Sequence, residues 1–358
     1  MSTASPFSCR YAPEFARLLD QLGASLVLST YQAGKLVFFS PNGAGGLRQL
    51  PRSMDRAMGV AEDAEREMLA VACRDRVHVF RNSRDLAEAY PKGPGKYDAL
   101  YMPRGTYYTG PLDVHDLHFG ADGALYAVNT LFSCIMRVGM AHSFESVWVP
   151  PFVDKVAPED RCHLNGLAME EGRPRFATAF NRGNAARSWR EGDLTASGVV
   201  MDVVENRVLA EGLGMPHSPT LVDGELYVLE SAKGALTRVD RETGATEEIA
   251  RFGGFVRGVA QAGEFLFIGL SKVRKSSKTF GAIAQAFERD VAGVIAFHLP
   301  SRRTVGRLEY EQSVEEIYDV HILQGKSQPN LLSPDAPLQS DGVTTVETTF
   351  WRKHQPDA

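Results

Sequence analysis

The chain has 358 residues, of which 44% are hydrophobic and 23% are charged, an ordinary composition for a globular protein. Its formal net charge of −5 argues against a polybasic surface for nucleic acid or an anionic membrane. No window approaches the roughly 18 consecutive apolar residues of a membrane span, and residues 1–15 lack the apolar core of a signal peptide. The four cysteines show no spacing of a zinc or redox motif. We therefore expect a cytoplasmic protein with reduced thiols that contacts neither nucleic acid nor membrane.

A pattern of two short strands around a glycine-containing turn recurs along the chain. After a weaker copy at 57–80, its clearest copies cover residues 114–130, 163–180, 217–240 and 256–271. Dipeptides such as Asp122-Gly123 and Asp223-Gly224 lie between the apolar runs, as tight hairpin turns require. A period of roughly 40–55 residues is typical of propeller blades.

The two ends of the chain are predicted to form one blade together. Five inner strands begin near residues 57, 114, 164, 218 and 257. Residues 315–323 would supply a sixth inner strand, and residues 25–40 the strands that follow it. This closure removes two exposed sheet edges. We therefore predict an all-β, six-bladed β-propeller over residues 25–328, with seven blades as the alternative, between an N-terminal extension (1–24) and a polar, partly unstructured tail (329–358).

Two segments depart from the repeat. Residues 90–113 are rich in Gly, Pro and Tyr and are predicted to form a long loop. Residues 272–292 form an insertion, in which Ile283, Phe287 and Val291 have helical spacing and indicate a short helix. Long loops in compact domains are often functional lids, so we expect both segments to cover the site.

Polar side chains stand at the starts of the predicted inner strands, which converge at one mouth of a propeller channel. His115, His163 and His217 fall on three successive blades. Neutral imidazole is the commonest transition-metal ligand, so these three are predicted to bind a metal, with zinc or iron fitting best. The Gly-rich segments at 43–46 and 93–95 lack the strand–turn–helix context of a nucleotide site, so no nucleotide cofactor is predicted.

Further polar residues near the same strand starts are predicted to bind or process a substrate. Burying such groups is costly unless they are paired, which favours a site over a neutral core. Arg257 and Arg274 are the predicted clamps for an anionic group. Glu316 or Asp319 is the predicted acid–base residue. The remaining predicted substrate-binding residues are Asp116, Asn165 and Ser218.

Three functional interpretations stay open at this point. The first is a metal-dependent enzyme, a lyase, hydrolase or oxygenase, acting on a small or peptide-derived, anionic substrate. The second is a metal-free propeller that binds a ligand or a protein partner without catalysis. In the third, the channel residues only bind ordered waters or orient turns.

The segments HDLHF, CHLNGLA, MPHSP with GELYVLES, GFVRGVA with LFIGLSKVRKSS, and EEIYDV together resemble a bacterial family of conserved proteins of unknown function. The resemblance covers about Ser29 to Asn330 and implies a propeller-like fold with no established activity. The family's motifs contain Tyr31, Gln32, His115, Asp116, His163, Asn165, His217, Ser218, Arg257, Arg274 and Glu316. At the level of fold, the chain is also similar to six-bladed gluconolactonase, amidating-lyase and streptogramin-lyase propellers, which place metal ligands at the channel mouth.

Overall fold

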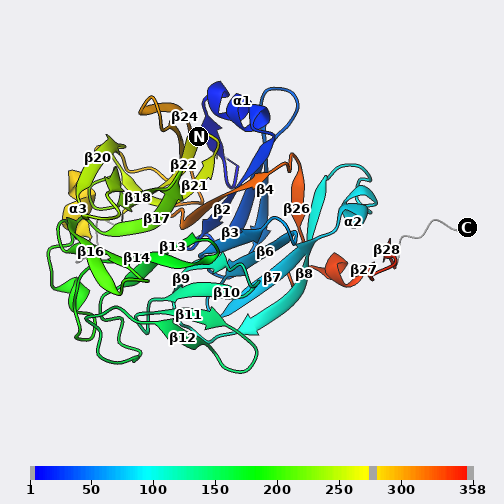
Figure 1. The fold of residues 1–358 in the computed structure, drawn as a ribbon. Helices are drawn as coiled ribbons and strands as arrows, with labels where there is room; N and C mark the ends of the chain where they lie inside the picture. The colour runs from blue at the N-terminus through cyan, green and yellow to red at the C-terminus, as the bar shows by residue number, and fades with distance from the viewer. Residues whose placement is uncertain (1–4, 274–279, 353–358) are drawn as a thin grey trace, which may run out of the picture.

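A computed structural model describes residues 5–273 and 280–352. Its strands form six blades around one axis, which confirms the predicted six-bladed propeller (Figure 1). The hairpin turns follow the glycine pattern: Asp223 and Gly224 both have positive φ, at 50° and 82°, as a type I′ turn requires. The segment 274–279, which contains the predicted anion clamp Arg274, lies outside the described residues.

Five blades are built from four consecutive strands each. From the inner to the outer strand they are β5 (Val60–Asp63), β6 (Met68–Ala72), β7 (Arg76–Asn82), β8 (Ala99–Tyr108); β9 (Val114–Phe119), β10 (Leu125–Asn129), β11 (Cys134–Val138), β12 (Glu145–Trp148); β13 (Leu164–Glu170), β14 (Arg173–Ala179), β15 (Gly198–Asp202), β16 (Arg207–Leu213); β17 (Pro216–Val222), β18 (Glu225–Glu230), β19 (Ala235–Val239), β20 (Thr246–Arg251); and β21 (Phe255–Ala262), β22 (Phe265–Ser271), β23 (Gly293–His298), β24 (Arg303–Tyr310).

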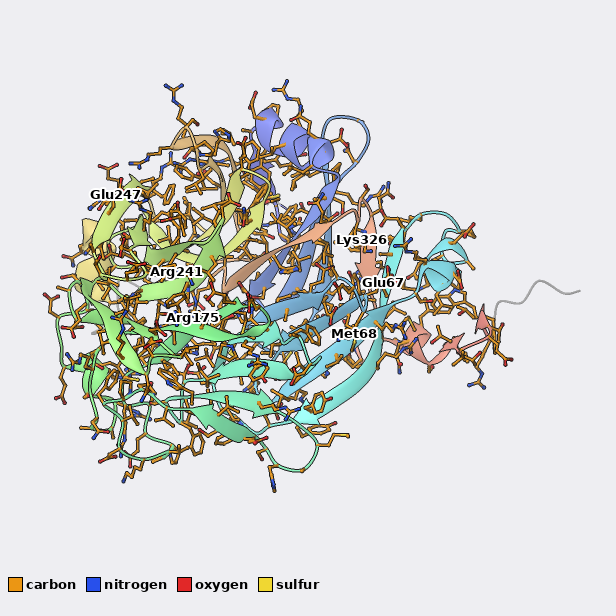
Figure 2. All side chains as sticks on the ribbon, in the orientation of Figure 1. Glu67, Met68, Arg175, Arg241, Glu247 and Lys326 are labelled. Carbon is orange, nitrogen blue, oxygen red and sulfur yellow. The ribbon has the colours of Figure 1, made fainter. Side chains whose placement is uncertain are left out.

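The sixth blade joins the two ends of the chain, as predicted. Its inner strand β25 (Asp319–Gln324) pairs antiparallel with β2 (Ala24–Thr30), which is followed by β3 (Lys35–Pro41) and β4 (Leu47–Ser53). Just after β25, Lys326 reaches the neighbouring blade, where its Nζ lies 3.3 Å from Glu67 Oε1 (Figure 2). Strand β2 is thereby paired on both edges, by β25 and by β3.

The N-terminal extension packs onto the propeller. Helix α1 (Pro13–Gln21) starts with a proline, whose fixed φ suits a first helical turn. Its residues Phe15 and Leu19 are fully buried in the cluster formed with the blade β21–β24. Strand β1 (Cys9–Tyr11) pairs with β24 and becomes the outermost strand of that blade.

The predicted lid at 90–113 is wrong. The central part of this segment forms β8, which pairs with β7 and is the fourth strand of its blade, counted outward from the channel. Its residues Tyr90 and Tyr97 pack with Trp351, beside helix α2 (Arg84–Glu88). Tyr90 and Tyr97 therefore belong to a small separate hydrophobic core, called the satellite core, on the outside of the ring.

Part of the tail predicted at 329–358 forms secondary structure that packs on the outside of the ring. Strand β26 (Pro329–Leu331) pairs in parallel with β8, and η2 (Pro337–Ser340) leads to a hairpin of β27 (Gly342–Thr344) and β28 (Thr349–Trp351). Trp351 is buried and donates a hydrogen bond from Nε1 to Leu86 O, 3.2 Å away. One buried indole with a satisfied N–H therefore anchors the hairpin.

The insertion contains the predicted short helix, α3 (Gly281–Ala286). Its Ile283 is buried against Phe180 and Trp189, the latter from the turn η1 (Ser188–Arg190). The insertion thus contributes to an apolar layer above the blades β13–β16 and β17–β20. None of the helices in the ranges 5–273 and 280–352 has the length and apolarity needed to cross a membrane.

Candidate functional site at the channel mouth

Each inner strand begins with two positions that meet those of the other blades around the channel. Neighbouring inner strands approach each other closely at these positions. A Cβ added to Gly59 would lie 3.0 Å from Asp116 Cα, and one added to Gly258 would lie 2.9 Å from Asp319 Cα. These close approaches fix how the strands of neighbouring blades line up. The first positions form a ring of Met58, His115, Asn165, His217, Arg257 and Tyr318. The second positions form a ring of Gly59, Asp116, Gly166, Ser218, Gly258 and Asp319. Asp116 and Asn165, both predicted to bind substrate, therefore belong to different rings.

The second ring alternates glycine with a polar residue, and every polar residue bridges to the next blade. The three bridges are Leu167 N to Asp116 Oδ2 (2.8 Å), Gly258 N to Ser218 Oγ (3.0 Å) and Val60 N to Asp319 Oδ2 (2.9 Å). These side chains therefore satisfy backbone N–H groups of the next inner strand. The structure thus gives a structural role to Asp116, Ser218 and Asp319. Their predicted roles in substrate binding and catalysis remain predictions.

His115 is held as a hydrogen-bond acceptor facing the channel. Its Nδ1 lies 3.0 Å from Asp113 O and 2.8 Å from Thr130 Oγ1, while Thr130 Oγ1 donates its own proton to Leu164 O (2.5 Å). A carbonyl oxygen only accepts hydrogen bonds, so the proton of the neutral ring resides on Nδ1. The lone pair is then on Nε2, for which the described residues provide no partner.

His217 repeats this arrangement two blades further on. Its Nδ1 donates to Met215 O (2.9 Å) and approaches Ser231 Oγ (2.7 Å), whose proton goes to Val256 O (2.5 Å). The residues whose carbonyls accept these hydrogen bonds, Asp113 and Met215, both have left-handed backbones, with φ of 56° and 49°. We call each set of carbonyl, imidazole and hydroxyl a histidine station.

Burial keeps both stations neutral. It lowers the pKa of His115 to about 4, against the partly compensating charge of Asp113. It also lowers the pKa of His217 well below its ordinary value, and the positive charge of Arg257 adds to this effect. At neutral pH both Nε2 atoms are therefore acceptors.

His163 is built differently from the other two histidines. It has a left-handed backbone (φ 51°), and its Nδ1 lies 3.1 Å from Asp160 Oδ1. Its ring packs against Phe180 and Trp189, with centroids 4.4 Å and 4.3 Å away. Its centroid is also 4.9 Å from that of His115. Across 5–273 and 280–352, no group of three or more His, Cys, Asp or Glu side chains is arranged to hold a metal ion, so metal binding by the three histidines stays a prediction.

Arg257 lies flat on Tyr318 and has no anionic partner. Its Cζ is 3.4 Å from the ring centroid of Tyr318, which is stacked on its other neighbour Tyr31 at 5.7 Å. Within the part of the chain that the structure describes, the guanidinium makes no ion pair, and its positive charge acts on the hydroxyl of Tyr318. Tyr318 is 6% exposed, and its hydroxyl has no well-aligned hydrogen-bond partner among those residues. Burial raises the pKa of Tyr318 well above its ordinary value, so the hydroxyl is a donor.

A cavity of about 260 Å³ runs along the channel from the first ring past the second. Both stations, Arg257 and Tyr318 line one end, and Glu62 and His321 line the other. Asp319 lies between, and burial, followed by the charge of Asp116, raises its pKa to about 6. A carboxyl that titrates near neutral pH and faces a cavity is suited to hold or move a proton.

The remaining predicted site residues have distinct positions. Asn165 lines the cavity, where its Nδ2 donates to His163 O (3.1 Å) and its Oδ1 accepts from Thr178 (2.9 Å). Glu316 lies two residues before Tyr318, outside the strand and outside the lining of the cavity. Its predicted acid–base role is therefore less well supported by its position than that of Asp319.

A comparison with models of protein families assigns the chain to one family. Residues 13–332 match the model described as "Domain of unknown function (DUF4915)". The chain belongs to this family. The match confirms the resemblance to a family of unknown function, and the DUF4915 region includes helix α1, which the sequence motifs did not reach. A search of the curated proteins finds no match.

Solved structures resemble the DUF4915 fold at low sequence identity. A chain of the "Crystal structure of Nidogen/Laminin Complex" is 12% identical with a TM-score of 0.52, covering 84% of this chain and 99% of that one. A protein of unknown function from Bacteroides caccae is 11% identical with a TM-score of 0.52, covering 84% and 98%. A streptogramin B lyase structure is 12% identical with a TM-score of 0.38, covering 78% and 74%. The first two similarities support the fold and indicate nothing about function, and the third, at a TM-score of 0.38, is too low to support either.

Sequence reasoning missed the residues that support the DUF4915 site. Thr130 follows His115 by 15 positions and Ser231 follows His217 by 14, each at the end of the second strand of the blade. These similar spacings of histidine and hydroxyl, 15 and 14 residues, were visible in the sequence. Tyr318 is not among the predicted site residues, because an aromatic residue in an apolar strand is more often part of the core than a platform for an arginine.

Proposed function

We propose that the channel mouth binds a small organic anion, whose carboxylate pairs with the guanidinium of Arg257. The observation that supports this most directly is the lack of any anionic partner for Arg257 among residues 5–273 and 280–352. Its half-buried charge has lost hydration, which the ring of Tyr318 compensates only in part. Stacking on Tyr318 fixes the plane of the guanidinium, whose edge suits bidentate binding of a carboxylate.

The size of the cavity limits the ligand. Its 260 Å³ corresponds to roughly nine times the volume that a water molecule occupies in the liquid. This space fits a molecule of about ten non-hydrogen atoms, and it favours a small molecule over a peptide segment. The polar groups converge at one end of the cavity, as is usual in small-ligand sites.

Asp113 is an acidic residue whose charge interacts with that of Arg257, and it provides a control. Burial acts to raise its pKa, but His115, His163 and Arg257 outweigh that effect and lower it, so Asp113 is anionic at neutral pH. Its carboxylate is not within ion-pair distance of Arg257. Removing its charge should therefore strengthen the binding of an anion without removing a contact to it.

Isothermal titration calorimetry with propionate, succinate and L-lactate in the presence of EDTA tests this function. We expect Arg257→Gln to weaken binding by about ten- to thirtyfold, the scale of a charge-assisted hydrogen bond. Asp113→Asn should strengthen it severalfold, and Arg251→Gln, on the outer strand β20, should have no effect. Equal affinities for the wild type and Arg257→Gln, or no binding of any of these acids by the wild type, would overturn the proposal.

Metal-dependent catalysis at the same mouth is a second candidate. It is favoured by the anchored Nδ1 atoms of His115, His163 and His217, because metal-ligating histidines also fix their second nitrogen in this way. Among residues 5–273 and 280–352, the three imidazoles are not arranged as a metal centre.

Elemental analysis of untagged protein checks this candidate. If the three histidines bind a metal, the wild type will contain about one zinc or iron per chain, and a folded His163→Ala/His217→Ala variant will contain none. Metal-free wild-type protein that also fails to bind added zinc, iron, manganese or copper would reject the metal and leave the anion site intact. Circular dichroism of the double variant confirms that it has folded.

A further inference from the structure

The chemistry of the two histidine stations identifies the class of ligand. We infer that the ligand is a small hydroxycarboxylate, whose carboxylate pairs with Arg257 and whose hydroxyl groups donate hydrogen bonds to Nε2 of His217 and His115. This inference rests on the anion site proposed above. The independent observation behind it is that both imidazoles are fixed as acceptors by the same arrangement of neighbours.

The tautomer of each station follows from its hydrogen bonds. Nδ1 of His217 faces a carbonyl oxygen, and Ser231 has already donated its proton to Val256 O. Nδ1 must therefore carry the hydrogen of the neutral ring, and the Nε2 that remains is an acceptor. The same reasoning applies to His115 through Thr130. Two acceptors oriented in this way at a cavity wall require donors from the ligand or from water.

The order of residues around the mouth matches the groups of such a ligand. Arg257 and His217 stand on neighbouring blades, and His115 stands two blades beyond His217 in the same ring. A carboxylate at Arg257 therefore has an acceptor on the adjacent blade for a hydroxyl on the next carbon. A second hydroxyl further along the molecule would face His115.

Other ligand classes match this set of groups less well. A phosphate carries up to two negative charges and several acceptor oxygens, whereas Arg257 is the one cationic donor among the described residues at the mouth, beside three neutral donors: the Tyr318 hydroxyl, the Ser218 hydroxyl and the remaining N–H of Asn165. An ammonium group would favour a free carboxylate, but Asp116 and Asp319 already accept backbone N–H groups. Hydroxyl groups are neutral donors, which suits neutral acceptors in a buried site.

A series of matched acids tests the inference on wild-type protein in EDTA. Lactate, propionate and alanine differ only in a hydroxyl, a hydrogen or an ammonium on the second carbon, and tartrate and succinate form a second pair. We expect lactate to bind at least tenfold more tightly than propionate or alanine, and tartrate at least tenfold more tightly than succinate. A site built to accept a hydroxyl proton discriminates strongly against an analogue without one.

The outcomes separate this inference from the proposed function. Equal binding of lactate and propionate that still depends on Arg257 would overturn the hydroxyl requirement and keep the anion site. Alanine binding as tightly as lactate would replace the hydroxyl with an ammonium group and also overturn it. Failure of all five acids to bind would reject both proposals.

Replacement of a station histidine locates the effect. His217→Phe retains the size of the ring and removes the acceptor, so the ratio of lactate to propionate affinity should fall from at least ten to about two or less. His115→Phe provides a second variant should the first not fold. A ratio that stays at ten in both folded variants would overturn the assignment of Nε2 as the acceptor.

Discussion

Replacing Gly258 with alanine should lower the free energy of unfolding by about 4 kcal/mol, because two penalties add at this position. The residue has a left-handed backbone with φ of 75°, which costs an L-residue about 1–2 kcal/mol. A new Cβ would also lie 2.8 Å from Val320 N and 2.9 Å from Asp319 Cα. These are backbone atoms of the next blade, so the contact is relieved only by separating two inner strands.

Gly263→Ala is the matched control for this variant. Gly263 also has a positive φ, at 55°, but a Cβ there would meet nothing within 4 Å. Gly263→Ala should therefore lower the free energy of unfolding by only about 1 kcal/mol, from the backbone conformation alone. Urea unfolding of both variants measures the difference, and similar values for the two would show that the blades do not require the close approach at Gly258.

The stability contributed by Asp319 should fall by at most about 3 kcal/mol as the pH rises from about 4 to about 7. Burial and the charge of Asp116 raise its pKa to about 6 in the folded protein, above an ordinary value of 3.8. The folded state therefore holds a proton that the unfolded state has lost between these values. The contribution is fully present below pH 4 and is lost as the pH rises through 6. Access of water to the cavity makes 3 kcal/mol an upper limit.

Subtracting the pH profile of Asp319→Asn isolates this effect. Groups such as His115, whose pKa is lowered, produce a slope of the opposite sign in the wild type. The free energy of unfolding, measured in urea from pH 4 to 7, should fall with pH in the wild type relative to the variant. A difference that is constant over this range would show that Asp319 titrates normally and would remove it as the proton-holding group of the mouth.

The fold was predictable from the sequence because it is repeated. Glycine turns and alternating apolar residues recur in every blade, and the closing pair of β25 and β2 follows from the need to cover two edges. The prediction of a lid at 90–113 failed because its tyrosines pack against a distant part of the chain. Tyr90 and Tyr97 belong to a satellite core with Trp351, a partner more than 250 residues away that no local pattern indicates.

The site was predictable as a group of residues but not as a geometry. Strand alternation places neighbours on opposite faces, yet His217 and Ser218 both line the cavity because the strand is bulged between His217 and Thr220. The left-handed Ser218, with φ of 48°, produces this bulge and is not predicted by residue type. The pairing of Arg257 with Tyr318 likewise depends on the closing blade, which brings together strands from different repeats.

The mixed origin of the sixth blade also determines when the mouth is formed during synthesis. Strand β2 leaves the ribosome before the other five blades, but its partner β25 follows about 300 residues later, since Ala24 pairs with Gln324. At roughly 5–20 residues per second this is a delay of about 15–60 s. During that time one edge of β2 lacks its partner, and Arg257 lacks the aromatic platform of Tyr318. A nascent chain arrested before residue 318 would therefore carry both histidine stations and still be unable to position the guanidinium.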